Sequence, residues 1–262
     1  KRLAVHETPD GVYDCAWSEQ EESQIAFGCG DGTVKLLDTK NDKVLQTWNE
    51  HSAEVYAVAW NPINREQVLS GSWDHTLKLW HVDTNISIRT FASHRNCVYA
   101  ARWHPRYADM FASASGDLTV KLWDANTSAP ALTFKAHDNE VLTLDWSKYR
   151  DHELFTGSVD KSVRVWDIRA LRTPVRQLSG HEFAVRRIKA SPHDANVLLT
   201  TSYDMSACVW DMSREDALVA RFEEHTEFVV GCDWSVFEEG KVATCAWDNT
   251  VRVWRARDWA TV

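Results

Sequence analysis

Residues 71–80 read GSWDHTLKLW, and this stretch decides the fold. An aspartate in a turn-forming segment stands six residues before a tryptophan, with strand-forming residues between them. The pattern returns in ASGDLTVKLWD at residues 114–124. Along the chain it places tryptophans at intervals of 43, 43, 44 and 44 residues: Trp80, Trp123, Trp166, Trp210 and Trp254. A fixed period over nearly the whole chain indicates an array of one supersecondary unit.

Each period predicts four short β-strands. In the second period, turn signals separate four runs rich in branched and aromatic residues: Val55–Trp60, Gln67–Ser72, Leu77–Val82 and Ile86–Phe91. No helical periodicity of useful length is present. Four strands in about 43 residues are typical of a β-propeller blade, so we expect an all-β protein. The periods lie near 9–50, 51–93, 94–136, 137–180, 181–224 and 225–262, and we expect one domain over residues 1–262.

A histidine, a serine or threonine, an aspartate and a tryptophan recur at constant offsets. We expect the carboxylate to accept from the imidazole, and the hydroxyl to join the imidazole to the indole N–H. The alternative is a Ser-His-Asp catalytic triad, but five copies favour a structural tetrad. The first period departs from it, with Phe27, Leu37 and no aligned histidine. The five tetrads are His51, Ser70, Asp74, Trp80; His94, Ser113, Asp117, Trp123; His137, Thr156, Asp160, Trp166; His181, Thr200, Asp204, Trp210; and His225, Thr244, Asp248, Trp254.

The repeated phrases resemble the WD40 repeat family. Two less common segments, HEFAVRRIKASP at residues 181–192 and HTEF at residues 225–228, resemble the WD40 peroxins that act as receptors for the type-2 peroxisomal targeting signal. WD40 rings most often have seven blades, so the resemblance implies about one further blade upstream, with a six-bladed ring as the alternative. Residues 1–8 then look like the last strand of that earlier blade.

The resemblance also implies a function. Members of this family are cytosolic cargo receptors that bind an N-terminal amphipathic helix of matrix enzymes, of the form Arg-Leu-x₅-His-Leu. They act with a co-receptor peroxin and the peroxisomal docking machinery, and they shuttle between cytosol and peroxisome. We therefore expect a protein without enzymatic activity and without a cofactor.

The expected binding surface is the rim where the first strand of each blade begins. From the repeat spacing, we assign three positions of each period to this rim. They are the third and fifth residues after the histidine and the residue before the turn aspartate. Glu54 and Glu140 are candidates for pairing with an arginine of the ligand. The other candidates, mostly aromatic or apolar residues suited to an amphipathic helix, are Tyr56, Trp73, Tyr99, Tyr203, Trp247, Tyr13, Leu142 and Arg186.

Amino-acid composition and net charge limit the kinds of binding partner to expect. The 262 residues are 44% apolar and 26% charged, as in soluble globular proteins. A net charge of −9 disfavours a nucleic-acid partner and favours a cationic ligand. No apolar stretch reaches the roughly 18 residues of a membrane span. The six cysteines form no CxxC pair, which favours buried, reduced thiols.

Two other function classes stay open. A chromatin or ubiquitin-ligase adaptor could use Trp73, Trp247 and the tyrosines as an aromatic cage for a basic or methylated side chain. An enzyme is the weaker alternative, because no paired carboxylates or nucleophile stand outside the repeat. The remaining histidines have no metal-ligand spacing: His75, His81, His104, His152 and His193.

Overall fold

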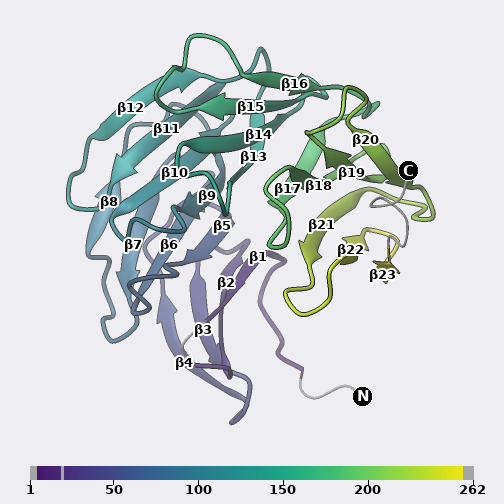
Figure 1. Cartoon of the computed structure of the whole chain (residues 1–262). Helices are drawn as coiled ribbons and strands as arrows, with labels where there is room; N and C mark the ends of the chain where they lie inside the picture. The colour runs from purple at the N-terminus through teal and green to yellow at the C-terminus, as the bar shows by residue number, and fades with distance from the viewer. Residues whose placement is uncertain (1–4, 19–20, 256–262) are drawn as a thin grey trace. The chain divides into compact units, whose positions relative to one another are not determined.

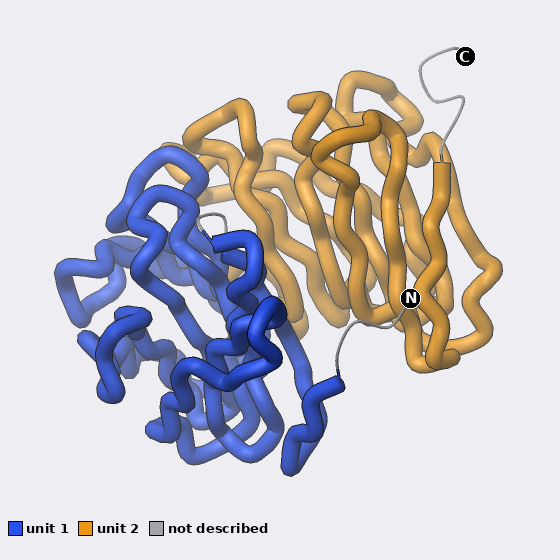
Figure 2. The backbone as a smooth tube through the Cα atoms, turned by 90° about the horizontal axis from the view of Figure 1, so that it is seen from below, with its two compact units in different colours: residues 1–134 blue, residues 135–262 orange. Residues whose placement is uncertain are grey.

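The computed structural model describes residues 5–18 and 21–255, and within them every regular element is a β-strand (Figure 1). Contacts divide the chain into two compact units, residues 1–134 and 135–262 (Figure 2). The prediction of an all-β protein is confirmed. The single domain stays a prediction, and each unit is described by itself below.

The first unit is built from three four-stranded antiparallel sheets in which each strand pairs with the next along the chain. Such meanders are the expected result of four short strands joined by tight turns. The strands are β1 (Val12–Trp17), β2 (Gln24–Cys29), β3 (Val34–Asp38), β4 (Lys43–Trp48); β5 (Val55–Trp60), β6 (Gln67–Ser72), β7 (Leu77–His81), β8 (Arg89–Phe91); and β9 (Val98–Trp103), β10 (Met110–Ser115), β11 (Thr119–Asp124), β12 (Pro130–Lys135).

The second unit repeats this topology, with two four-stranded sheets followed by a three-stranded sheet in the described residues. Its strands are β13 (Val141–Trp146), β14 (Glu153–Ser158), β15 (Val163–Asp167), β16 (Arg176–Leu178); β17 (Val185–Ala190), β18 (Val197–Ser202), β19 (Ala207–Asp211), β20 (Leu218–Phe222); and β21 (Val229–Trp234), β22 (Lys241–Ala246), β23 (Val251–Arg255). We call each sheet a blade and number the blades one to six.

Neighbouring blades of a unit share one apolar core. Trp48 of the first blade stacks on Trp80 of the second, with 5.4 Å between ring centroids, and both are fully buried. Phe91 of the second blade meets Phe111 and Trp123 of the third at 5.0 and 5.4 Å. Burying aromatic rings between sheets stabilises the arrangement, because each ring removes a large apolar area from water.

Two strand boundaries differ from the prediction. β7 ends at His81 rather than Val82, and β8 begins at Arg89 rather than Ile86. The backbone N–H and hydroxyl of Ser87 both donate to the carboxylate of Glu50, at 2.8 and 2.7 Å, so Ser87 is held in the turn instead of the ladder. Of the strand expected at residues 1–8, residues 1–4 lie outside the described part, and residues 5–8 form no strand.

In the described part of the chain, the cysteines form no disulfide bond. Cys29, Cys208 and Cys232 are buried, whereas Cys15 is exposed, so the prediction of buried thiols applies to only some of the six. Burial raises the pKa of the Cys208 thiol to about 12, which leaves it protonated and unreactive at neutral pH. Over residues 5–18 and 21–255, no helix has the length and apolarity that a membrane crossing requires.

Candidate functional site

Each complete repeat carries the predicted hydrogen-bonded tetrad. In the third blade, His94 Nδ1 lies 2.8 Å from the Asp117 carboxylate, and His94 Nε2 lies 2.7 Å from Ser113 Oγ. The indole N–H of Trp123 donates to the same hydroxyl at 2.8 Å. The other four tetrads have the same bonds, with imidazole–carboxylate distances of 2.7–2.9 Å. With the imidazole neutral and its proton on Nδ1, every polar group of the tetrad has a partner. Nδ1–H donates to the carboxylate, Nε2 accepts from the hydroxyl, and the hydroxyl oxygen accepts from the indole N–H.

The tetrad hydroxyls are unsuited to nucleophilic catalysis. Ser70, Ser113, Thr156 and Thr200 are each 0% exposed. Each hydroxyl is also held between an imidazole and an indole. A nucleophile must reach its substrate, so these groups act as staples inside each blade rather than as catalytic triads.

Sequence reasoning missed a fifth member of each tetrad. The residue two positions after every turn aspartate is a serine or threonine whose hydroxyl donates to the aspartate at 2.5–2.7 Å: Thr33, Thr76, Thr119, Ser162, Ser206 and Thr250. Its constant spacing was a signal available in the sequence. The first blade keeps this bond between Asp31 and Thr33 although it lacks the histidine, so its turn is retained without the staple.

Burial opposes ionisation of the tetrad aspartates, but their hydrogen bonds prevail. At Asp74, burial alone would raise the pKa. The hydrogen bond and charge of His51, with the bonds from Thr76, outweigh burial and hold the pKa of Asp74 well below its usual value. At Asp117, Asp160 and Asp204, the same balance against burial lowers the pKa. The carboxylates are therefore anionic at neutral pH.

The rim positions expected from spacing are joined in pairs by backbone hydrogen bonds. In every blade, the N–H of the residue before the turn aspartate donates to the carbonyl of the residue that immediately precedes the first strand. We define the rim of a blade as this pair and the strand residue two positions later. The six pairs, with donor–acceptor distances of 2.8–3.1 Å, are Gly30–Gly11, Trp73–Glu54, Gly116–Cys97, Val159–Glu140, Tyr203–Ala184 and Trp247–Phe228.

In the first unit, four rim aromatics form one cluster. Tyr56 stacks between Tyr13 and Trp73, with ring centroids 4.4 and 4.7 Å apart. Tyr99 meets Tyr56 and Trp73 edge-on, at 5.8 and 6.1 Å. An aromatic cage binds a methylated lysine through open ring faces, whereas stacking covers both faces of Tyr56. Within this unit the aromatic-cage alternative is therefore disfavoured.

Two carboxylates accompany the aromatic cluster of the first unit. Glu54 is partly exposed, and its side chain has no hydrogen bond or ion pair with any described residue. Asp10, which sequence reasoning missed, lies over Gly30: a Cβ added to Gly30 would come within 2.9 Å of all three carboxyl atoms. Its signal was a place three residues before the rim aromatic Tyr13. A cationic group beside these carboxylates would be stabilised by charge.

In the second unit, two aromatic side chains at or near the rim are largely exposed. Phe228 lies between Tyr203 and Trp247, with centroid distances of 4.8 and 5.3 Å, and Trp247 is 60% exposed. Phe183, which sequence reasoning missed, is 58% exposed with the Lys161 ammonium 5.8 Å from its ring centroid. The sequence feature that could have indicated Phe183 is its position two residues after the tetrad histidine His181.

The remaining candidates of the second unit differ in accessibility. Glu140 is partly exposed, and its side chain has no hydrogen bond or ion pair with a described residue. Leu142 and Arg186 are buried, at 6% and 7% exposed, so both present little surface to a ligand. The structure brings Glu54, Tyr13, Tyr56, Trp73 and Tyr99 together in one unit, and Tyr203 and Trp247 in the other.

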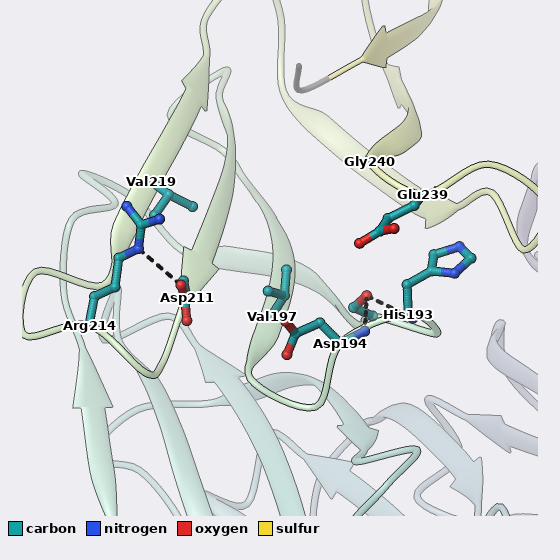
Figure 3. Close-up of a pocket in the computed structure, with 9 residues that line it drawn as sticks. His193, Asp194, Val197, Asp211, Arg214, Val219, Glu239 and Gly240 are labelled. Carbon is teal, nitrogen blue, oxygen red and sulfur yellow. Dashed lines mark hydrogen bonds and ion pairs between the residues drawn. The ribbon is translucent and has the colours of Figure 1, made fainter. Parts of the chain in front are cut away.

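A small pocket lies at the opposite ends of the strands in the second unit (Figure 3). It has a volume of about 180 Å³ and lies between the fifth and sixth blades. Asp211 is ion-paired with Arg214 at 3.0 Å. The backbone N–H of His193 donates to Ser191 Oγ at 3.1 Å, and its Nε2 donates to the carbonyl of Ser235, from the sixth blade, at 2.7 Å. Its lining residues are Ser191, His193, Asp194, Val197, Asp211, Arg214, Val219, Glu239 and Gly240. The pocket contains no rim residue, so it is separate from the candidate site.

Comparison with known proteins places this architecture in a family. The model of the WD domain, G-beta repeat, matches residues 42–81, 85–124, 128–167, 172–211 and 217–255. A Peroxisomal targeting signal 2 receptor of Dictyostelium discoideum is 55% identical over 239 residues, which cover 90% of this chain and 76% of that protein. The chain belongs to the WD40-repeat family of peroxisomal targeting signal 2 receptors.

Other relatives match over shorter stretches. The Peroxisome biogenesis protein 7 of Arabidopsis thaliana is 50% identical over 84 residues, 32% of this chain and 26% of that protein. The Peroxisomal targeting signal 2 receptor of Mus musculus is 42% identical over 86 residues, 33% of this chain and 27% of that protein. The matched stretches thus span about a quarter of these two relatives.

Proposed function

We propose that this chain is a receptor for the type-2 peroxisomal targeting signal and acts as a binding protein rather than an enzyme. The observation that carries the proposal is the 55% identity over 90% of the chain to a protein of that name. The rim chemistry supports it independently, because an aromatic cluster beside the partly exposed Glu54, whose carbonyl accepts from the Trp73 N–H, suits a cationic amphipathic peptide.

The ligand is the signal segment of a matrix enzyme, folded as a short amphipathic helix. Its arginine pairs with Glu54 or Glu140, since a charge-assisted hydrogen bond to an unpaired, partly exposed carboxylate is favourable. Its leucines lie on the aromatic cluster around Tyr56 and Trp73, as in helix-in-groove recognition. The same proposal assigns the function to the cytosol and the peroxisome.

A co-receptor peroxin completes the site. One short helix covers less surface than a standard protein–protein interface, so affinity from this chain alone is modest. The exposed aromatics of the second unit, Trp247 and Phe183, offer further apolar surface. Two weak contacts to one helix then give an adequate affinity. Delivery to the peroxisomal docking machinery follows binding.

Fluorescence anisotropy with a labelled signal peptide, in the presence of co-receptor, tests the proposal. Glu54→Gln removes the charge without changing the shape, and we expect affinity about tenfold weaker, with the same loss when the arginine of the peptide becomes alanine. Glu21→Gln is the matched control, because Glu21 is an exposed acid at the other strand ends of the first unit. Equal affinity for the arginine and alanine peptides contradicts the proposal.

A histone-tail peptide in the same assay separates the alternatives. Binding of that peptide by a chain that ignores the signal peptide would assign it to the adaptor class instead. Glu140→Gln, with the exposed Glu215→Gln as control, repeats the test in the second unit. Loss of binding in only one of Glu54→Gln and Glu140→Gln would assign the arginine contact to that carboxylate.

A further inference from the structure

The turn between the second and third strands of each blade forces one residue into the left-handed conformation. In the second blade, His75 N–H donates to the Ser72 carbonyl at 3.2 Å, and Ser72 N–H donates to the Thr76 carbonyl at 3.1 Å. This hairpin places the residue after the turn aspartate at positive φ. The φ values are 83° at Gly32, 70° at His75, 69° at Leu118, 72° at Lys161, 66° at Met205 and 61° at Asn249.

Stability alone favours glycine or asparagine at this position. A Cβ crowds the backbone in the left-handed conformation, whereas glycine has none and asparagine tolerates it. Gly32 and Asn249 follow this rule. Four of the six turns instead hold large side chains: His75, Leu118, Lys161 and Met205. Their presence therefore needs a reason outside the turn itself.

No hydrogen bond within the described structure compensates for the conformation of these side chains. His75 and Lys161 are exposed, Met205 is 40% exposed, and none of the three side chains donates to or accepts from a described residue. The contact of Lys161 with the Phe183 ring, at 5.8 Å from its centroid, is itself partly open to solvent. Strained residues without internal compensation are found where their side chains serve a ligand.

The four side chains also lie next to the rim. Each stands two residues after a rim residue, as His75 follows Trp73 and Met205 follows Tyr203. His75, Lys161 and Met205 therefore extend the rim surface of their own blades into solvent, and Leu118 adds a partly exposed side chain to the rim of the third blade. Turn residues at this place can meet a ligand that rests on the rim aromatics.

We propose that His75, Leu118, Lys161 and Met205 are ligand-contact residues, retained in a left-handed turn that glycine would stabilise. The inference rests on the proposed function and adds specificity residues to that site. In the first unit, Leu118 adds apolar surface and His75 adds polar surface beside the rim. In the second unit, Met205 adds apolar surface through its flexible thioether, and Lys161 adds a positive charge.

Paired substitutions separate strain from contact. Met205→Gly and Leu118→Gly relieve the turn and delete the side chain, so we expect a melting temperature about 2–4 °C higher. The same variants bind the labelled signal peptide about fivefold more weakly. Met205→Ala deletes the contact but keeps the Cβ, so we expect the weaker binding without the gain in melting temperature. Asp42→Gly, at a left-handed residue (φ 54°) on the opposite strand ends, leaves affinity unchanged.

The outcomes are distinct. Wild-type protein that binds the peptide while both glycine variants bind equally well overturns this inference and leaves the proposed function standing. Wild-type protein that binds no signal peptide overturns the proposed function and this inference with it. If the glycine variants melt at or below the wild-type melting temperature, the turns are not strained, and the inference about these four residues is also overturned.

Discussion

At the scale of single residues, the turn aspartates organise each blade. The Asp117 carboxylate accepts from His94 at 2.8 Å, from the backbone N–H groups of Arg95 and Thr119 at 3.0 Å, and from the Thr119 hydroxyl at 2.5 Å. One side chain thus connects the start of the first strand to the turn between the second and third. Such a carboxylate satisfies several donors at once.

Asp117→Ala tests that role. It leaves a buried imidazole N–H and two backbone N–H groups without their acceptor, so we expect a loss of about 1–3 kcal/mol in the free energy of unfolding. Denaturant unfolding followed by circular dichroism measures it. Asp109→Ala is the control, because Asp109 is an exposed acid of the same blade. Equal stability of the two variants would mean that the staple assignment is wrong.

At the scale of structural elements, the turn between the first and second strands has its own cap. In the third blade, Nδ1 of the fully buried His104 accepts from the N–H groups of Arg106 and Tyr107, at 3.1 and 3.2 Å. Asn61 Oδ1 does the same in the second blade, at 3.0 Å for both donors. His104, which the sequence left without a role, is therefore a turn cap.

The cap predicts an order of stability for three His104 variants. His104→Asn supplies the acceptor that Asn61 uses, and we expect the smallest loss. His104→Phe keeps the ring volume but removes the acceptor, and His104→Ala removes both. We expect the Phe variant to lose about 1–3 kcal/mol, because two backbone N–H groups lose their partner. Thermal and denaturant melts measure the order, and a Phe variant as stable as the Asn variant contradicts the cap.

At the scale of the whole molecule, the repeated tetrads make stability depend on pH in one direction. Burial lowers the pKa of His94 and of His137 below the ordinary value of 6.5, even though Asp117 and Asp160 oppose the shift. Below pH 6.5, the unfolded chain therefore binds more protons than the folded chain. The tetrad aspartates add to this below pH 3.8, because their folded pKa values are also lowered.

We accordingly expect the free energy of unfolding to be highest near and above neutral pH, to fall as the pH drops from about 7 to 5, and to fall further below about 4. Urea unfolding at a series of pH values measures the profile. His75→Asn, which changes an exposed histidine outside the tetrads, leaves the profile unchanged. A chain that becomes more stable between pH 7 and pH 5 contradicts the neutral, buried imidazoles.

The repeat offsets were enough to predict the four-stranded units and the tetrad residues, because hydrogen-bond partners within a blade lie at constant separations along the chain. Strand ends were less predictable: Ser87 is held out of β8 by Glu50, 37 residues away. A contact of that kind leaves no local pattern in the sequence.

What only the tertiary structure decided is how neighbouring blades meet. The stacking of Tyr56 between Tyr13 and Trp73, the burial of Leu142 and the position of Asp10 over Gly30 all depend on side chains from different sheets or distant segments. The sequence by itself determined which residues each blade contains, since a period is a local property. Whether a rim side chain is accessible to a ligand depends on packing between blades, because a neighbouring blade of the same unit can cover it or leave it exposed.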